Sequence, residues 1–241
     1  MNEERIRSWH ATHNGTKRNH NEDTWVDRPD LGVWAVADGA GGHQAGEVAS
    51  GKIAEALDSL PPELSASDLI DAVRTRISET HRWLREEAER RDLHGIIAST
   101  VVALLIRDEH FACLWAGDSR AYLLRDGEMQ QITKDHSLVQ ELVDNGTITA
   151  AEAEHHPHAN VITRAVGADI EELVLDKVSG RLLPGDRFLL CSDGLCKTVP
   201  FERLVELLSG ENDTTASDSL IAEALALEVT DNVTAVTLRV S

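Results

Sequence analysis

Four aspartates lie at the ends of apolar segments that have the composition of β-strands. They are Asp38 after residues 31–37, Asp118 after 111–116, Asp193 after 188–191, and Asp231 before 233–240. Asp38 and Asp193 are each followed at once by glycine, which lets the backbone approach closely and frees its carbonyl for coordination. Oxygen ligands favour hard ions such as Mg²⁺ or Mn²⁺ over zinc. Because closely gathered carboxylates repel one another without cations, the pattern predicts a centre that binds several metal ions.

Five short motifs extend this pattern over nearly the whole chain. They are Arg18 with Asn21-Glu22-Asp23, Val36 to His43, Ala116 to Arg120, Cys191 to Gly194, and Asp231 to Thr234. Each motif is weak alone, but the five occur in the order found in one family. The chain therefore resembles the protein phosphatase 2C family, and in particular its bacterial, stand-alone serine/threonine phosphatases.

The resemblance implies two core metal ions, Mn²⁺ or Mg²⁺, and a metal-bridging water that attacks the substrate phosphorus. Asp38 would bridge the two ions, and the Gly39 carbonyl would bind one of them. Asp193 and Asp231 would complete the other. Two such ions lower the pKa of a shared water and neutralise the phosphoryl oxygens, so no covalent phosphoenzyme is needed.

The resemblance also implies outer parts of the metal centre. Asp118, together with Asp193, would hold a third, weaker ion. Glu22 and Asp23 would act mainly through metal-bound waters.

Arg18 would hold the substrate phosphate, since a guanidinium can bind two phosphoryl oxygens in a fork. His43 is a candidate general acid for the leaving serine oxygen, because histidine titrates near neutrality. The alternative for His43 is a surface cap on the helix that begins near Gln44. Relatives from eukaryotes carry histidine directly after Asp-Gly, where this chain has Ala40, so both interpretations of His43 stay open.

The elements that must position these residues include many strands. Strands are expected over residues 31–37, 100–106, 111–116, 121–124, 188–191 and 233–240. Asp126-Gly127 predicts a hairpin turn before residues 129–132, and hence an antiparallel sheet. The last strand alternates apolar and polar residues, which predicts that it is half-buried.

Apolar spacing of three and four residues predicts helices between these strands. Two long ones run over residues 48–60 and 70–88, separated by Pro61-Pro62, and shorter ones over 137–144, 200–208 and 217–228. Strands covered by helices indicate the α+β class. The resemblance implies a central sandwich of two antiparallel β-sheets flanked by α-helices, and a mobile flap over about 137–165 in which Asn160 to Arg164 touch protein substrates.

Length and composition limit the remaining possibilities. The 241 residues contain no long linker, so we expect one catalytic domain over 1–241. A net charge of -19 argues against nucleic acid as a partner. The charged N-terminus, short apolar runs and three cysteines predict a cytoplasmic protein without a signal peptide or membrane span. The oligomeric state stays open, with a monomer as the working expectation.

The predicted function is the removal of phosphate from phosphoserine and phosphothreonine of proteins, opposing a Ser/Thr kinase. One alternative is a binding module that keeps the fold without activity, although loss of Asp38, Asp193 or Asp231 would have been its signature. A second alternative is a metal-dependent phosphatase of a small phosphorylated metabolite.

Overall fold

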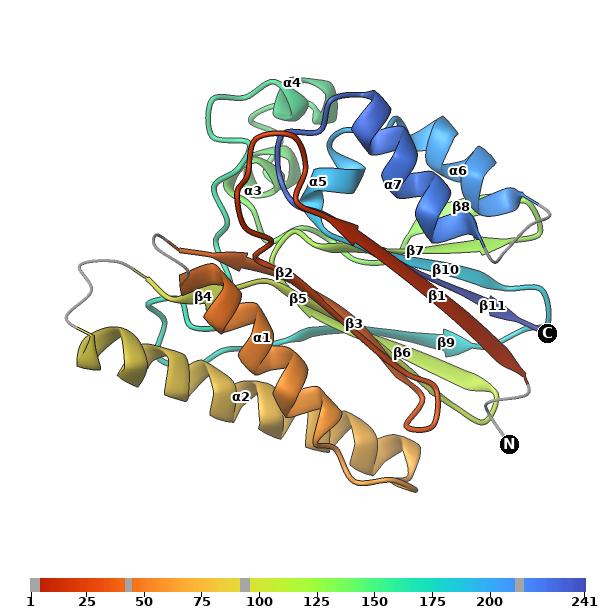
Figure 1. Cartoon of the computed structure of the whole chain (residues 1–241), viewed down its shortest axis with the longest axis horizontal. Coiled ribbons are helices and arrows are strands. Elements are labelled where there is room, and N and C mark those ends of the chain that lie inside the picture. The colour runs from red at the N-terminus through yellow and green to blue at the C-terminus, as the bar shows by residue number, and fades with distance from the viewer. Residues whose placement is uncertain (1–4, 42–44, 92–95, 211–214) are drawn as a thin grey trace.

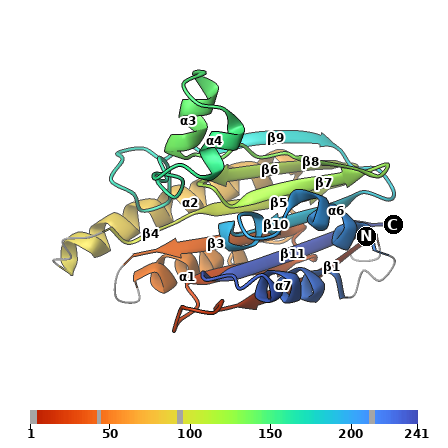
Figure 2. The same ribbon diagram turned by 90° about the horizontal axis from the view of Figure 1, so that it is seen from above.

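The computed structural model describes residues 5–41, 45–91, 96–210 and 215–241. Two antiparallel β-sheets lie face to face, and helices cover both outer faces (Figures 1 and 2). The first sheet has the order β1 (Ile6–His13), β11 (Val233–Val240), β10 (Arg187–Cys191), β7 (Arg120–Arg125), β8 (Glu128–Gln131). The second has the order β2 (Asp23–Arg28), β3 (Val33–Ala40), β5 (Val101–Arg107), β6 (His110–Ala116), β9 (Asp176–Arg181), with β4 (Ala98–Ser99) paired to β3. The predicted α+β sandwich is confirmed.

The helices form two outer layers and one end of the molecule (Figure 1). The layer over the second sheet consists of α1 (Ala45–Asp58) and α2 (Ala66–Arg90), and the layer over the first consists of α5 (Asp193–Cys196), α6 (Phe201–Ser209) and α7 (Ala216–Ala226). At the end lie α3 (Leu138–Asp144) and α4 (Ala150–Glu154). None of the described helices is both long and apolar enough to cross a membrane.

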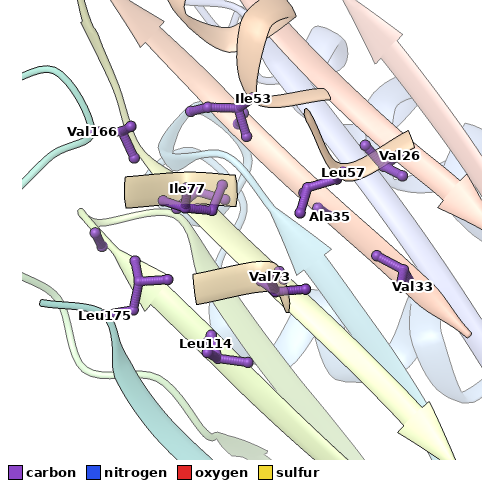
Figure 3. Close-up of a cluster of buried hydrophobic side chains, with 14 of the residues drawn as sticks. Val26, Val33, Ala35, Ile53, Leu57, Val73, Ile77, Leu114, Val166 and Leu175 are labelled. Atoms are coloured by element: carbon purple, nitrogen blue, oxygen red, sulfur yellow. The ribbon is translucent and has the colours of Figure 1, made fainter. Parts of the chain in front are cut away.

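Three apolar clusters hold the four layers together. Val33, Ile53 and Ile77 represent the cluster between the second sheet and its helices (Figure 3). A second cluster, which includes Phe188, fills the space between the two sheets. A third, which includes Leu220, lies between the first sheet and α6 and α7. Burial of apolar surface on both faces of each sheet fixes the sandwich and therefore the edge where the carboxylates lie.

The last strand differs from its prediction. Alternation predicted one solvated face for β11, but nearly every residue of this strand is buried. Thr237, on the face expected to be polar, is 2% exposed, and its hydroxyl lies 2.8 Å from that of Ser217 on α7. Thr237 therefore faces a helix layer rather than water.

Four strands were not predicted, namely β1, β2, β4 and β9. The β1 segment mixes aromatic, charged and hydroxyl side chains, and β9 is alternately exposed at the edge of its sheet. The hairpin at Asp126-Gly127 is confirmed, with Arg125 paired to Glu128. The helix expected over 137–144 is α3, and its N-cap is Ser137, whose hydroxyl accepts the backbone N–H of Gln140.

Candidate metal centre

Two of the carboxylates lie opposite each other on neighbouring strands. Asp23 opens β2 and its Cα pairs with that of Asp38 in the antiparallel register. Asp38 lies within β3 rather than after it, because the strand continues through Gly39 and Ala40 to pair with β4. Like charges directly opposite on two strands destabilise a sheet. The fold therefore accepts an electrostatic cost at this position.

Three more carboxylates reach the same edge, two from loops and one from the start of a short helix. Asp118 lies between β6 and β7, where the chain passes from one sheet to the other, Asp193 opens α5, and Asp231 precedes β11. Burial raises the pKa of Asp38 well above its usual range, and the charges of Asp23, Asp193, Asp118 and Asp231 raise it further. The five aspartates predicted from the sequence thus share one electrostatic environment.

Asp23 is nearly inaccessible, with 7% of its surface exposed. Its Oδ2 accepts hydrogen bonds from the hydroxyls of Ser192 and Thr234, each at 2.7 Å. Its Oδ1 is buried without a hydrogen-bond partner in the described part of the chain. Burial raises the pKa of Asp23 to about 7, although the two hydroxyls act in the opposite direction. An unpartnered buried oxygen of this kind suits coordination of a cation or an ordered water.

The backbone around Asp38 is fixed by the neighbouring segment. Its N–H donates to Thr100 Oγ1 at 3.1 Å, and its carbonyl accepts from the Thr100 N–H at 2.8 Å and the Ser99 hydroxyl at 2.9 Å. The next residue, Gly39, packs so closely on α1 that a Cβ would lie 2.1 Å from the Gly46 carbonyl oxygen. The glycine after Asp38 is therefore required by close packing.

Asn232 was part of a motif, but the sequence indicated no role for it. Its Oδ1 accepts the backbone N–H of Glu22 at 2.8 Å, and its Nδ2 donates to the carbonyls of Asn14 at 3.0 Å and His20 at 2.9 Å. One side chain thus holds both ends of the segment that carries Arg18. Since Asn232 follows Asp231, this segment is kept beside the carboxylates.

Arg18 contacts the cluster directly. Its guanidinium donates to Asp231 Oδ2 at 2.8 Å, and its side chain is 54% exposed. The hydrogen bond and charge of Asp231 raise the pKa of Arg18, so it is cationic. A guanidinium carries five N–H donors, so this contact does not exhaust its capacity to bind an anion.

Lys197 was not predicted as a site residue, yet it lies at the centre of three side chains. Its Nζ donates to Asp118 Oδ2 at 2.9 Å, to Asp193 Oδ2 at 2.8 Å and to Asn160 Oδ1 at 3.1 Å. Burial alone would lower its pKa, but Asp193 and Asp118 raise it above its usual range. The spacing of four residues from Asp193 was a signal available in the sequence.

The Asp135-His136 pair supports the turn that carries Asp118. Arg120 donates to both oxygens of Asp135, with its closest contact at 2.7 Å. His136 Nδ1 accepts the backbone N–H of Gly117 at 3.1 Å. These contacts hold the residues on both sides of Asp118 and act on the backbone of the turn.

Two further predicted residues have different outcomes. Glu22 is half-buried, and burial raises its pKa while Arg18 lowers it. His43, the candidate general acid, lies outside the described residues. The choice between general acid and helix cap for His43 therefore stays a prediction.

The donor set suits hard divalent ions. All five aspartates offer oxygen, and Asp23 Oδ1 and Asp118 Oδ1 are buried without partners in the described part of the chain. As the side chains stand, no three His, Cys, Asp or Glu residues among those described are arranged to hold a single ion. Arg18 and Lys197 bind Oδ2 atoms of Asp231, Asp118 and Asp193. Neither of these two cations binds Asp23 or Asp38, so the carboxylates of this pair are left for metal ions or for waters bound to them.

Comparisons with known proteins agree with this geometry. Residues 3–142 match the model of the family described as Protein phosphatase 2C. The serine/threonine protein phosphatase PstP of Mycobacterium tuberculosis is 40% identical over 203 residues, which cover 84% of this chain and 39% of PstP. The chain belongs to the protein phosphatase 2C family.

Two solved structures show the same fold over nearly the whole chain. PppA, described as a key regulatory component of T6SS in Pseudomonas aeruginosa, is 42% identical with a TM-score of 0.92, over 98% of both chains. The catalytic domain of PstP in complex with two manganese ions is 36% identical with a TM-score of 0.83, also over 98% of both chains. The sandwich described above is therefore the fold of this family.

Proposed function

We propose that the chain is a metal-dependent serine/threonine protein phosphatase. The observation that carries this proposal is the convergence of five aspartates from both sheets, with burial raising the pKa of three of them, Asp23, Asp38 and Asp118. So much buried negative charge is costly unless cations neutralise it. The likeness to PstP with two manganese ions indicates which cations these are.

Asp38, the Gly39 carbonyl, Asp193 and Asp231 would hold two Mn²⁺ or Mg²⁺ ions. Asp23 and Glu22 would act through waters, since Asp23 is already held by two hydroxyls. When bound, such ions supply Lewis-acid chemistry, activating water at neutral pH and neutralising charge on the phosphoryl oxygens. The chain's own contribution is to hold these oxygen donors rigidly at one edge of the sandwich.

Arg18 would orient the substrate phosphate. It is cationic and exposed, and its hydrogen bond to Asp231 holds it beside the carboxylates. Its remaining N–H groups can donate to phosphate oxygens. His43 remains our candidate for proton transfer to the leaving oxygen, on its place in the sequence alone. Asp118 belongs to the same centre at its outer part.

The substrates we propose are phosphoserine and phosphothreonine proteins, including targets of a Ser/Thr kinase. Substrate segments would meet the surface over 137–165, the proposed flap, which lies at the end of the molecule that carries α3 and α4 (Figure 2). The cysteines Cys113, Cys191 and Cys196 are free thiols, which suits a reducing cytoplasm and signalling there. Residues from both sheets form one site, which favours a single catalytic domain over 1–241.

The test is hydrolysis of a phosphothreonine peptide with Mn²⁺, with Mg²⁺ and after chelation. We expect activity that requires metal and that falls at least about a hundredfold in Asp38→Asn, the scale seen when a preorganised electrostatic group is lost. Asp71→Asn, an exposed aspartate on α2, is the matched control and should keep full activity.

Phosphorylated metabolites assayed beside the peptide separate the alternatives. Faster hydrolysis of a metabolite would replace the protein substrate by a small one. A folded protein without activity in any metal would favour the binding module.

A further inference from the structure

The two carboxylates of the outer part of the centre are already bridged by a cation of the chain. Lys197 Nζ lies 2.9 Å from Asp118 Oδ2 and 2.8 Å from Asp193 Oδ2. The side chains of Asp118 and Asp193 are 2% and 20% exposed and that of Lys197 is 30% exposed, so water screens the contact with Asp118 less than the contact with Asp193. A lysine carries its positive charge at neutral pH.

We propose that Lys197 takes the place of a third divalent ion at Asp118 and Asp193, so that the enzyme works with two metal ions and a covalently attached cation. This inference rests on the proposed function, because it concerns the same metal centre. It departs from what the family resemblance implied for these two aspartates. Lys197 is then a positioning residue, which acts through the carboxylates that it holds.

The backbone of α5 places the Cα of Lys197 close to Asp193. Asp193 opens the single turn of α5 and Lys197 is its C-cap, with the Lys197 N–H donating to the Asp193 carbonyl at 2.9 Å. Leu195, between them, is fully buried, and a Cβ on Gly194 would lie 2.0 Å from the Asn232 carbonyl oxygen. Because α5 is packed this tightly, only the side chain of the lysine has to be ordered for it to reach both carboxylates.

An ammonium and a divalent ion compete for the same oxygens. A Mg²⁺ shared by Asp118 and Asp193 would need oxygens at about 2.0–2.1 Å, whereas their Oδ2 atoms already accept hydrogen bonds from Lys197. Asp118 Oδ1 remains buried and without a partner in the described part of the chain. An ion at that oxygen alone would face the lysine's charge and would lack the Asp193 oxygen that the lysine binds.

Lys197 also connects the centre to the proposed flap. Its third contact is Asn160 Oδ1 at 3.1 Å, from the segment expected to touch protein substrates. With a metal ion in this position, an exchangeable water would make the contact with Asn160. Lys197 instead makes this contact directly, through a side chain of the protein. The occupancy of the outer position is thus set by the sequence and not by the metal concentration.

The experiment is a count of Mn²⁺ ions bound at equilibrium, by dialysis with metal analysis and by calorimetry. We expect two ions in the wild type and a third in Lys197→Met, which removes the charge but keeps a side chain of similar length. The affinity of the third ion should rise about tenfold or more over the wild type, since a positive charge a few ångströms away is gone. Lys197→Arg keeps the charge and should bind two ions.

Lys134→Met is the matched control, because Lys134 also pairs with an aspartate, Asp144, but outside the centre. It should bind two ions like the wild type. Three ions in the wild type, or identical isotherms for wild type and Lys197→Met, would overturn the inference while leaving the metal-dependent function intact. No bound ion in any variant would overturn both. The wild-type count decides the matter even where Lys197→Met does not fold.

Discussion

The centre contains two pairs of aspartates that manage their charge in different ways. The strand pair, Asp23 and Asp38, lies across β2 and β3. The carboxylate of Asp23 accepts hydrogen bonds from two neutral hydroxyls, and the backbone N–H of Asp38 donates to a third. The bridged pair, Asp118 and Asp193, shares the ammonium of Lys197. The strand pair needs cations from solution, whereas the position between Asp118 and Asp193 is already filled by an ammonium of the chain.

This difference separates two tasks within one cluster. Ions that take part in hydrolysis must coordinate a water and lower its pKa, which the ammonium of a lysine cannot do, so the proposed core ligands must hold metal ions. A charge that holds loops in place needs no open coordination position, and a lysine fixed by α5 provides it. The comparison predicts unequal consequences for changes at the two pairs.

The largest difference should be in turnover. Asp38→Asn should lower kcat/KM on a phosphothreonine peptide at least about a hundredfold. Asp118→Asn should lower it about tenfold or less, because a carboxylate outside the core acts indirectly. Metal analysis should find both core ions in Asp118→Asn. Equal losses in the two variants would remove the distinction between the pairs.

The next largest effect should be on folding near the strand pair. Gly39→Ala places a Cβ 2.1 Å from the Gly46 carbonyl oxygen, where backbone must move. We expect a loss of about 3 kcal/mol or more in the free energy of unfolding, measured with urea. Gly51→Ala, in α1 with open space around it, should instead stabilise the protein by up to about 1 kcal/mol. Similar stability of both variants would contradict the packing argument.

The parts of the centre that follow from local pattern were predictable from the sequence. Aspartates beside apolar runs and the turn at Asp126-Gly127 depend on a few neighbouring residues, and the hairpin at that turn is confirmed. Asp38 differs in detail, because β3 continues through it to Ala40. The β2 strand that carries Asp23 was not predicted. Its six residues, Asp-Thr-Trp-Val-Asp-Arg, mix charged and apolar side chains and form no apolar run.

Contacts between distant segments could not be predicted in the same way. Lys197 meets Asp118 from 79 residues away, and Asn232 meets Glu22 from 210 residues away. Neither pairing has a local signature, since it arises only when both sheets are stacked. The burial of Thr237 on β11 was mispredicted for the same reason, because α7 covers that face.

The third effect should be a pH dependence that belongs mainly to the strand pair. Asp23 has a folded pKa raised to about 7, so its contribution to stability is present below the unfolded pKa and is lost as pH rises through about 7. The melting temperature of chelated protein should therefore fall by several degrees from about pH 5 to about pH 8.

Mn²⁺ should remove most of this slope, because it neutralises the same carboxylates. Asp23→Asn should flatten the slope of the chelated protein more than Asp118→Asn does, since Lys197 already compensates Asp118. A melting temperature that rises with pH in chelated protein would show that the sign is wrong.

The smallest effect should come from the link between the bridged pair and the proposed flap. Asn160→Ala removes one exposed hydrogen bond to Lys197, which is worth about 1 kcal/mol or less. We expect KM for a phosphothreonine peptide to rise about threefold with kcat nearly unchanged. The metal count should stay at two, because Asp118 and Asp193 still hold the lysine.

Asn145→Ala, whose side chain contacts Thr147 in the same segment and not Lys197, is the control. An equal rise of KM in both variants would mean that general loosening of the segment, and not the lysine link, governs substrate binding.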